Sequence, residues 1–187
     1  MLPLLAIPIG LVGLLTGISL ATGRRGLTML PKSPIRGIIL VRWTRFTRTM
    51  GRRPRNYESP RGRLGAFDMD ARRLSDVDFA ENPHKVIVGS ETGVWAADFK
   101  KPLTKDAFLG SLPLQYEAFK RSMVQMTPAV VGFVGTEVDG CKCSLSGLLG
   151  VGHMAGVAGV ASWVKSPEIR KKFKNTTEMF QATNGIF

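Results

Sequence analysis

A run without charge opens the chain: no charged side chain occurs from residue 1 to residue 23, and the run ends at Arg24 and Arg25. A helix rises about 1.5 Å per residue and needs about 20 apolar residues to cross the hydrocarbon layer of a membrane. Residues 1–23 are long enough, so they predict a transmembrane helix. A buried core segment or a secretory leader would also be apolar, but a leader usually carries basic residues before its apolar run.

Small residues mark one side of this predicted helix. Gly10, Gly13 and Gly17 recur at spacings of three and four, so they share a helical face. Pro3 falls in the first turn, where its missing N–H costs least, and Pro8 predicts a kink. Because small residues let two helices approach closely in lipid, we expect the glycine face to pack against another membrane helix.

Positive charge is concentrated in one segment. The formal net charge is +12, and the stretch from Arg24 to Arg73 holds fourteen Arg or Lys side chains against three acidic ones. Four prolines interrupt any long helix there, and large apolar residues are few. Such a segment buries too little surface to offset the entropy lost on ordering. Residues 24–84 are therefore predicted to form an extended basic arm that depends on a partner.

One short helix is predicted within the arm. The stretch IRGIILVRWTRF mixes apolar residues with arginines, and Arg42 and Arg45 fall on one helical face. A basic amphipathic helix of this kind lies at a membrane surface, with Trp43 and Phe46 at headgroup depth. A solvated helix packed on a partner protein is the alternative. Contact with lipid headgroups or a partner is expected for Arg24, Arg25, Arg36, Arg42, Trp43, Arg45, Arg52 and Arg53.

Residues 85–187 predict a small α+β region. The runs KVIV and VWAADF, separated by a turn that contains glycine, are typical of a β-hairpin. Thr104 is suited to cap a helix before Asp106, and Pro113 is expected to split the following stretch into two helices. The fold class predicted for the whole chain is mainly α, with a transmembrane helix, a basic arm and this C-terminal region.

A second long apolar stretch covers residues 143–164 and contains no ionisable group apart from the Cys143 thiol and His153. It is long enough to cross a bilayer, and Gly152 and Gly156 form a G-x-x-x-G pair suited to helix packing in lipid. Glycine disfavours a helix in water by about 1 kcal/mol relative to alanine. The stretch is therefore either a second membrane helix or a Gly-rich buried loop or hairpin.

The last predicted element is a short basic amphipathic helix. It follows Pro167 in the stretch EIRKKFKNTTEMFQ, which also contains Ile169, Phe173 and Phe180. These three residues are expected on its apolar side.

The sequence offers little catalytic or metal-binding chemistry. Cys141 and Cys143 form a C-x-C pair, whose side chains lie about 6 to 7 Å apart in a strand, too far for a disulfide. His153 could join them as a third metal ligand, but the set lacks the paired spacing of zinc motifs. No P-loop, dinucleotide motif or nucleophile elbow occurs. We therefore predict no enzymatic activity, no metal and no cofactor.

Two classes of partner could neutralise the basic arm. In RNA, the phosphates would pair with the basic side chains of the arm, as they do with the tails of ribosomal proteins. Trp43, Phe46 and Tyr57 could stack on bases. Anionic lipid headgroups attract basic residues by about 1 kcal/mol each. Only lipid also explains the uncharged run before the arm. The predicted partners are therefore anionic lipid and the other subunits of a large membrane complex, and nucleic acid is not favoured.

The first third of the chain combines an apolar helix with an early Leu-Pro, spaced glycines, a short basic connector, and then a Trp, a Met and an Arg pair. The residues concerned are Leu2, Pro3, Gly10, Gly13, Gly17, Trp43, Met50, Arg52 and Arg53. Together they resemble the MWFE accessory subunit of mitochondrial respiratory complex I, which has no counterpart to the chain after Tyr57. The resemblance implies a single-pass structural subunit of the inner membrane.

The chain is therefore expected to be an accessory (supernumerary) subunit of a respiratory complex in the mitochondrial inner membrane, supporting its assembly and stability. Complex I is the first choice. Another respiratory complex, ATP synthase and an RNA-binding mitochondrial ribosomal protein are the alternatives. The orientation stays open, because the family topology implied by the resemblance places the soluble part in the intermembrane space, whereas the positive-inside rule places Arg24 onward in the matrix.

Overall fold

Helices account for most of the chain that the computed structural model describes, residues 34–86 and 94–187, as predicted. These helices are α2 (Pro34–Met50), α3 (Ala71–Asp76), α4 (Lys105–Gly110), α5 (Leu112–Val130), η1 (Val131–Phe133), α6 (Leu145–Ala155), α7 (Val157–Lys165), α8 (Pro167–Lys172) and α9 (Lys174–Thr183). The strands are β1 (Ala80–Val86), β2 (Val94–Phe99), β3 (Glu137–Val138) and β4 (Cys141–Lys142). The predicted membrane helix lies outside the described residues, together with Gly10, Gly13, Gly17, Arg24 and Arg25.

The predicted hairpin is present. β1 and β2 pair antiparallel, with Ala80 opposite Phe99 and Val86 opposite Val94. β1 begins at Ala80, before the predicted KVIV run, and the Ala80 side chain is buried. The predicted boundary at residue 84 thus falls inside a strand, and residues 34–187 form one unit instead of an arm and a separate region.

Capping side chains start α4 and α5 close to where the sequence predicts. Thr104 caps α4, because its hydroxyl accepts a hydrogen bond from the Ala107 N–H at 3.1 Å. Ser111 caps α5 in the same way, accepting from the Leu114 N–H at 3.4 Å. Pro113 lies in the first turn of α5, where its missing N–H costs least. The predicted split into two helices is therefore confirmed.

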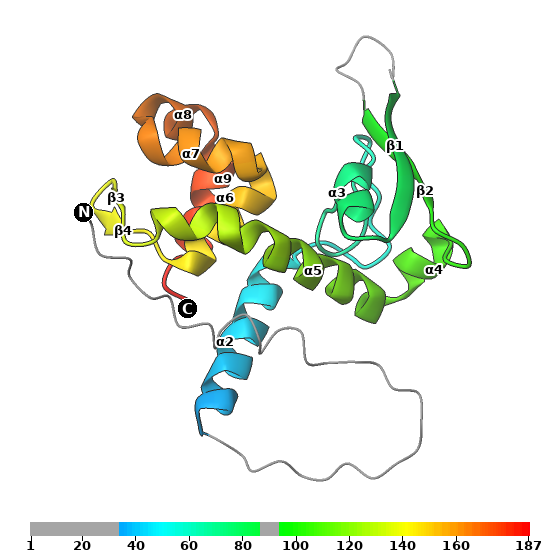
Figure 1. Ribbon diagram of the computed structural model, residues 1–187, viewed down its shortest axis with the longest axis horizontal. Helices are drawn as coiled ribbons and strands as arrows, with labels where there is room; N and C mark the ends of the chain where they lie inside the picture. The colour runs from blue at the N-terminus through cyan, green and yellow to red at the C-terminus, as the bar shows by residue number, and fades with distance from the viewer. Residues whose placement is uncertain (1–33, 87–93) are drawn as a thin grey trace, which may run out of the picture. The chain divides into compact units, whose positions relative to one another are not determined.

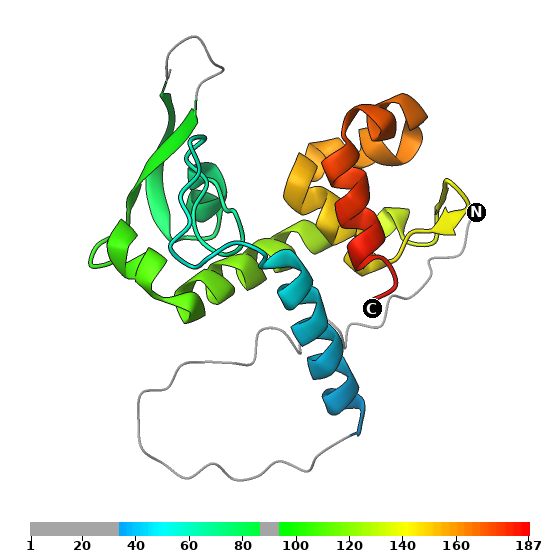
Figure 2. The same cartoon turned by 180° about the vertical axis from the view of Figure 1, so that it is seen from behind.

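α5 connects the two groups of elements in this unit. Figures 1 and 2 show it running from the side of α4 and the hairpin to the side of α6–α9, and it contacts α3, α4, α6 and α7. Phe119 of α5 is fully buried and stacks on Phe67, with ring centroids 4.4 Å apart. α5 therefore supplies the centre of the core.

Residues 51–79 do not form an extended arm. Gln115 of α5 fastens this segment, because its side-chain oxygen accepts from the Ala66 N–H at 2.8 Å and its amide donates to the Arg55 carbonyl at 2.8 Å. The prediction is wrong here because the apolar residues are irregularly spaced and find their partners far along the chain. The buried apolar residues of the segment are Leu64, Ala66, Phe67, Met69, Ala71, Leu74, Val77 and Phe79.

The apolar stretch 143–164 is not one helix. α6 and α7 meet at Gly156, whose φ is +74°, and the two helices are bent by 115°. Among the described residues, no single helix is long and apolar enough to cross a membrane, and this bent pair meets the criteria only by length and composition. The residues of α6 from Ser146 to His153 are all buried. The stretch therefore forms two helices, of which α6 is buried, and it matches neither a single second membrane helix nor a Gly-rich buried loop or hairpin.

Glycines bring α6 close to α9. A Cβ on Gly147 would lie 2.6 Å from Asn184 Oδ1, and a Cβ on Gly150 would lie 2.5 Å from Thr183 Oγ1. Ordinary contacts of a Cβ fall at 3.4–4 Å, so neither position accepts a side chain without movement. The two glycines make this helix contact possible.

The last predicted helix is broken as well. α8 and α9 meet at Phe173, and this side chain is 49% exposed. Ile169 packs against the core and Phe180 is buried, as predicted. The prediction that Phe173 shares one helical side with these two residues is wrong, because the chain turns at Phe173.

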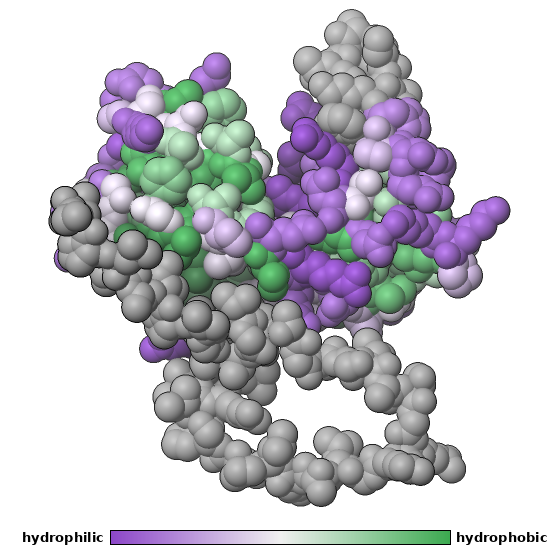
Figure 3. Space-filling view, in the orientation of Figure 1, coloured by the Kyte–Doolittle hydropathy of each residue, from purple (hydrophilic) through white to green (hydrophobic). Residues whose placement is uncertain are grey.

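Apolar side chains gather over α6 and α7, whereas hydrophilic ones cover the hairpin and α3 (Figure 3). Val131, Val134 and Val157 are among the exposed large apolar residues. Because η1 contacts α6, the uncharged stretch around η1 meets the uncharged stretch 143–164 on this side.

Candidate functional site

The inner face of α2 belongs to an aromatic core. Phe46 is fully buried, and its ring centroid lies 5.2 Å from that of Phe187 and 6.1 Å from that of Phe119. Trp43 is half-buried beside the same rings, and its Nε1–H donates to the Tyr116 hydroxyl. The structure therefore places Trp43 against the aromatic core, and these contacts fix the rotation of α2 about its axis.

The outer face of α2 is basic. Successive residues of a helix are about 100° apart, so Arg45 and Arg48 lie on the side opposite Met50, and Arg42 lies at the border between the two sides. All three arginines are exposed. Arg52 follows the helix, is exposed, and donates from Nε to the Thr49 carbonyl at 2.9 Å. We call Arg42, Arg45, Arg48 and Arg52 the basic face of α2.

No carboxylate neutralises the basic face of α2 within the part of the chain that the structure describes, where the ion pairs involve other residues. Arg53, the next residue, is also exposed, and its guanidinium lies over the Tyr57 ring at 4.9 Å from the centroid. Arg36 belongs to α2, but its side chain is outside the description. Arg42, Arg45, Arg52 and Arg53 of the predicted set are thus exposed, whereas Trp43 packs against the core.

His153 is buried and holds α3 against α6. Arg73 donates from Nη1 to His153 Nδ1 at 2.7 Å and to the His153 carbonyl at 3.1 Å, and from Nη2 to the Gly152 carbonyl at 3.3 Å. An arginine only donates, so Nδ1 carries no proton. Burial, and then the charge of Arg73, hold the pKa of His153 well below its usual range. The guanidinium thus caps the C-terminal end of α6, where a positive charge is favourable.

The two cysteines do not complete a site with His153. Cys141 is exposed in β4, whereas Cys143 is buried, and burial raises the pKa of the Cys143 thiol. Across residues 34–86 and 94–187, no group of three His, Cys, Asp or Glu side chains could hold a metal ion. His153 Nδ1 is already occupied by Arg73.

A buried arginine that the sequence did not single out closes α7. Arg170 binds both carboxylate oxygens of Asp139 at 2.9 Å and donates from Nη1 to the Trp163 and Val164 carbonyls at 2.9 and 3.0 Å. Pairing with Arg170 lowers the pKa of Asp139. Arg170 stands in a run of basic residues that predicts an exposed face, and nothing local distinguishes it from its neighbours.

Of the two glycines predicted for helix packing in this stretch, only Gly152 lies within a helix. A Cβ there would lie 3.3 Å from Met126 Sδ and 3.5 Å from Val160 Cγ2, in the core. Gly156 ends α6 at a positive φ, and a Cβ there would meet no atom within 4 Å. The G-x-x-x-G spacing therefore marks a helix end in this structure, and the glycines that lie closest to α9 are Gly147 and Gly150.

No protein-family model, no curated protein and no solved structure matches this chain. Its function has to be argued from its own residues. The described residues offer two basic regions that a partner could use, the basic face of α2 and a cleft considered below. The first is the candidate site for attachment to a membrane complex.

Proposed function

We propose that this chain is a membrane-anchored accessory subunit, and that the basic face of α2 lies against anionic lipid headgroups or acidic surfaces of neighbouring subunits. One observation carries the proposal: the fixed orientation of α2. Its inner face is locked in the core by Phe46, so Arg45 and Arg48 are held on the outer side. The uncharged residues 1–23 precede this helix in the sequence and supply the proposed anchor.

The charge of the basic face is better suited to orient the folded unit on a membrane than to anchor it there. Each basic residue near an anionic membrane surface contributes about 1 kcal/mol, so four arginines contribute about 4 kcal/mol. A spanning helix inserts almost irreversibly and contributes far more. In this proposal, residues 1–23 hold the chain in the membrane and the basic face sets how the folded unit sits on it.

The inner mitochondrial membrane enters the proposal through the resemblance to the MWFE subunit. On that basis we place the chain in a respiratory complex, with complex I as the first choice and another respiratory complex or ATP synthase next. Its role there is structural, in the assembly and stability of the complex. The proposed partners are the other subunits and anionic lipid.

Alkaline carbonate extraction of mitochondria tests the anchor. The full chain should stay in the membrane pellet, and a variant that lacks residues 1–23 should move to the supernatant. Full-length chain in the supernatant would overturn the proposal. Sedimentation of the full chain with ribosomal RNA would favour the RNA-binding alternative instead.

A native gel tests the basic face. The variant R42Q/R45Q/R48Q should enter the complex less well than the wild type, and identification of the co-migrating chains names the complex. The control variant K101Q/K165Q/K171Q removes the same charge at exposed lysines outside the basic face, and it should enter normally. Equal incorporation of the two variants would contradict a specific role for α2.

A further inference from the structure

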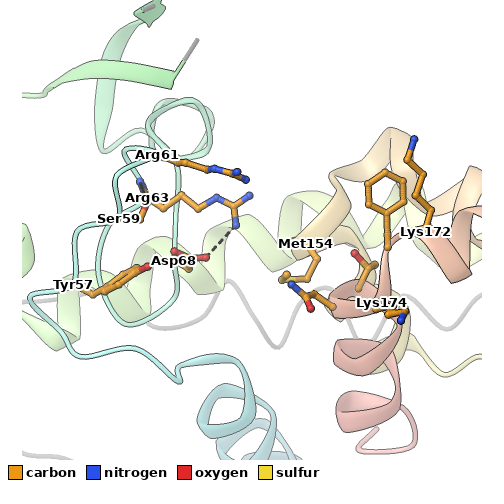
Figure 4. A pocket seen from close by; sticks show the side chains of 11 residues that line it. Tyr57, Ser59, Arg61, Arg63, Asp68, Met154, Lys172 and Lys174 are labelled. Atoms are coloured by element: carbon orange, nitrogen blue, oxygen red, sulfur yellow. Dashed lines mark hydrogen bonds and ion pairs between the residues drawn. The ribbon is translucent and has the colours of Figure 1, made fainter. Parts of the chain in front are cut away.

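A cleft of about 540 Å³ lies between the loop that joins α2 to α3 and the junction of α8 with α9 (Figure 4). The loop contributes Arg61 and Arg63, and the junction contributes Lys172 and Lys174. The lining contains one acidic residue, Asp68. Two segments far apart in the sequence thus bring basic side chains to one cavity.

Most of this positive charge has no acidic partner within the residues that the structure describes. Asp68 Oδ2 lies 3.0 Å from Arg63 Nη1 and offsets that one charge. Arg61 and Lys174 form no ion pair within the described residues, and Lys172 lies over the Phe173 ring with Nζ 5.6 Å from the centroid. Four basic side chains against one carboxylate leave three positive charges around the cleft.

The N-terminal end of α9 adds backbone donors to the lining. Phe173 at the N-cap offers no side-chain acceptor, and its carbonyl accepts from the N–H groups of Thr176 and Thr177. The N–H groups of Lys174 and Asn175, both lining residues, donate to no acceptor in the described part of the chain. Free N–H groups at the positive end of a helix favour an anion, such as a phosphate group.

Aromatic side chains and the size of the cleft indicate more than a lone anion. Tyr57 and Phe173 both contribute to the lining, and Phe173 is 49% exposed although it is apolar. Cavities of about 300 to 1,000 Å³ are typical of sites for small organic ligands. Apolar surface beside a concentrated positive charge suits a ligand with a phosphate at one end and an organic part at the other.

We propose that this cleft binds a phosphate group carried on a small organic body, either a soluble phosphate ester or the headgroup of an anionic phospholipid. The phosphate lies between Lys174 and Arg61 at the N-terminal end of α9, and the organic part lies against Phe173. The inference rests on the cleft itself and does not require the chain to be a subunit of a membrane complex.

Isothermal titration of the full chain in phosphatidylcholine nanodiscs tests the site, with glycerol 3-phosphate as the probe at low salt. The variant R61Q/K174Q should bind about tenfold more weakly, because it loses two unpaired cations. Its circular dichroism should match that of the wild type, since both side chains are exposed. The control K165Q/K171Q loses the same charge outside this cleft and should bind like the wild type.

Removing the acidic lining residue should act in the opposite direction. Asp68→Asn should tighten binding of glycerol 3-phosphate, because the carboxylate no longer opposes the phosphate and Arg63 becomes available. Asn tolerates the positive φ of 52° at this position, so the loop should keep its shape. Weaker binding by this variant would contradict a phosphate at this place.

A second probe separates the two sources of phosphate. Dihexanoyl phosphatidic acid adds two acyl chains to the same glycerol phosphate, so much tighter binding assigns the cleft to a lipid headgroup and equal binding assigns it to a soluble ester. No binding of either probe at about 10 mM, or equal loss in the cleft and control variants, overturns the inference. The variant R42Q/R45Q/R48Q should bind normally, which separates this result from the test of the proposed function.

Discussion

The close approach of α6 to α9 can be tested by adding one methyl group at a time. A Cβ on Gly150 would lie 2.5 Å from Thr183 Oγ1, and Thr183 is fully buried with its hydroxyl donating to the Met179 carbonyl at 2.7 Å. A Cβ on Gly147 would lie 2.8 Å from Phe180 Cε2, and Phe180 is only 4% exposed. Neither neighbour is the free end of a flexible side chain, so α9 itself must move.

Two opposing terms set the expected change in the free energy of unfolding. Alanine favours a helix over glycine by about 1 kcal/mol. Forcing a group into filled space costs about 1 to 3 kcal/mol. The upper part of that range applies, because 2.5 Å is 0.9 Å shorter than the 3.4 Å at which ordinary contacts begin. Gly147→Ala and Gly150→Ala should each lower the free energy of unfolding by about 1 to 2 kcal/mol, and the double variant by less than the sum, since one shift of α9 relieves both contacts.

Urea unfolding of the full chain in mild detergent, followed by tryptophan fluorescence, measures this change. Trp163 is buried 4.7 Å from the Phe180 ring, so its emission reports on the same contact. The matched control is Gly132→Ala in η1, where a Cβ would meet no atom within 4 Å, and its effect should stay within about 0.5 kcal/mol. If the α6 variants were as stable as this control, α6 would not pack on α9 and a membrane helix over 143–164 would be the better account.

Three further substitutions test buried polar and aromatic contacts in the same assay. Arg170→Lys should lower the free energy of unfolding by about 2 kcal/mol, because lysine cannot hold the Asp139 carboxylate and two carbonyls together; an unchanged urea midpoint would contradict these contacts of the buried Arg170. The pKa of His153 is lowered in the folded state, so the unfolded chain binds that proton more readily and stability should fall as the pH drops below about 6.5, by up to about 1.4 kcal/mol per pH unit. His153→Gln should remove that part of the slope between pH 7.5 and 5, and an identical slope would contradict the neutral ring. Trp43→Ala should cost about 2 kcal/mol, because Trp43 packs in the core and donates to Tyr116, whereas a residue at headgroup depth would cost almost nothing in detergent.

The sequence predicts those helices and strands that are determined by neighbouring residues. Thr104 and Ser111 cap their helices through contacts three residues along the chain, so residue type and spacing nearly suffice to predict such caps. The hairpin follows from two strand-like runs with a turn between them. The first half of β1 was missed because AENPH has no strand-like alternation.

The core contributed by residues 51–79 could not be predicted because its contacts are not local. Phe67 stacks on Phe119, and Gln115 binds Ala66 across 49 residues of sequence. A pattern read from neighbouring residues cannot reveal partners this far apart in the sequence, and the high charge of residues 51–79 favours the prediction of an extended arm. The apolar residues were too irregular to reveal a helix or a strand, because they lie in loops and a short helix.

The glycines of α6 show why one residue type allows opposite interpretations. Gly152 and Gly156 match a membrane packing motif, yet Gly156 takes a φ of +74° and ends the helix. A positive φ and a close helix contact both favour glycine, and only the backbone conformation tells them apart. The contact residues Gly147 and Gly150 have a spacing of three, which fits one face of a helix in water as well as in lipid.

The contacts of α2 decide how the proposed anchor and the folded unit act together. If α2 were a separate amphipathic helix, its arginines could rotate toward any partner, and removing it would leave the rest of the fold intact. Phe46 is instead fully buried against Phe119 and Phe187, so removing α2 would expose the aromatic centre of the core. The arginines are therefore held by the fold itself, and a displacement of α2 would break the contact between Phe46 and Phe119 of α5.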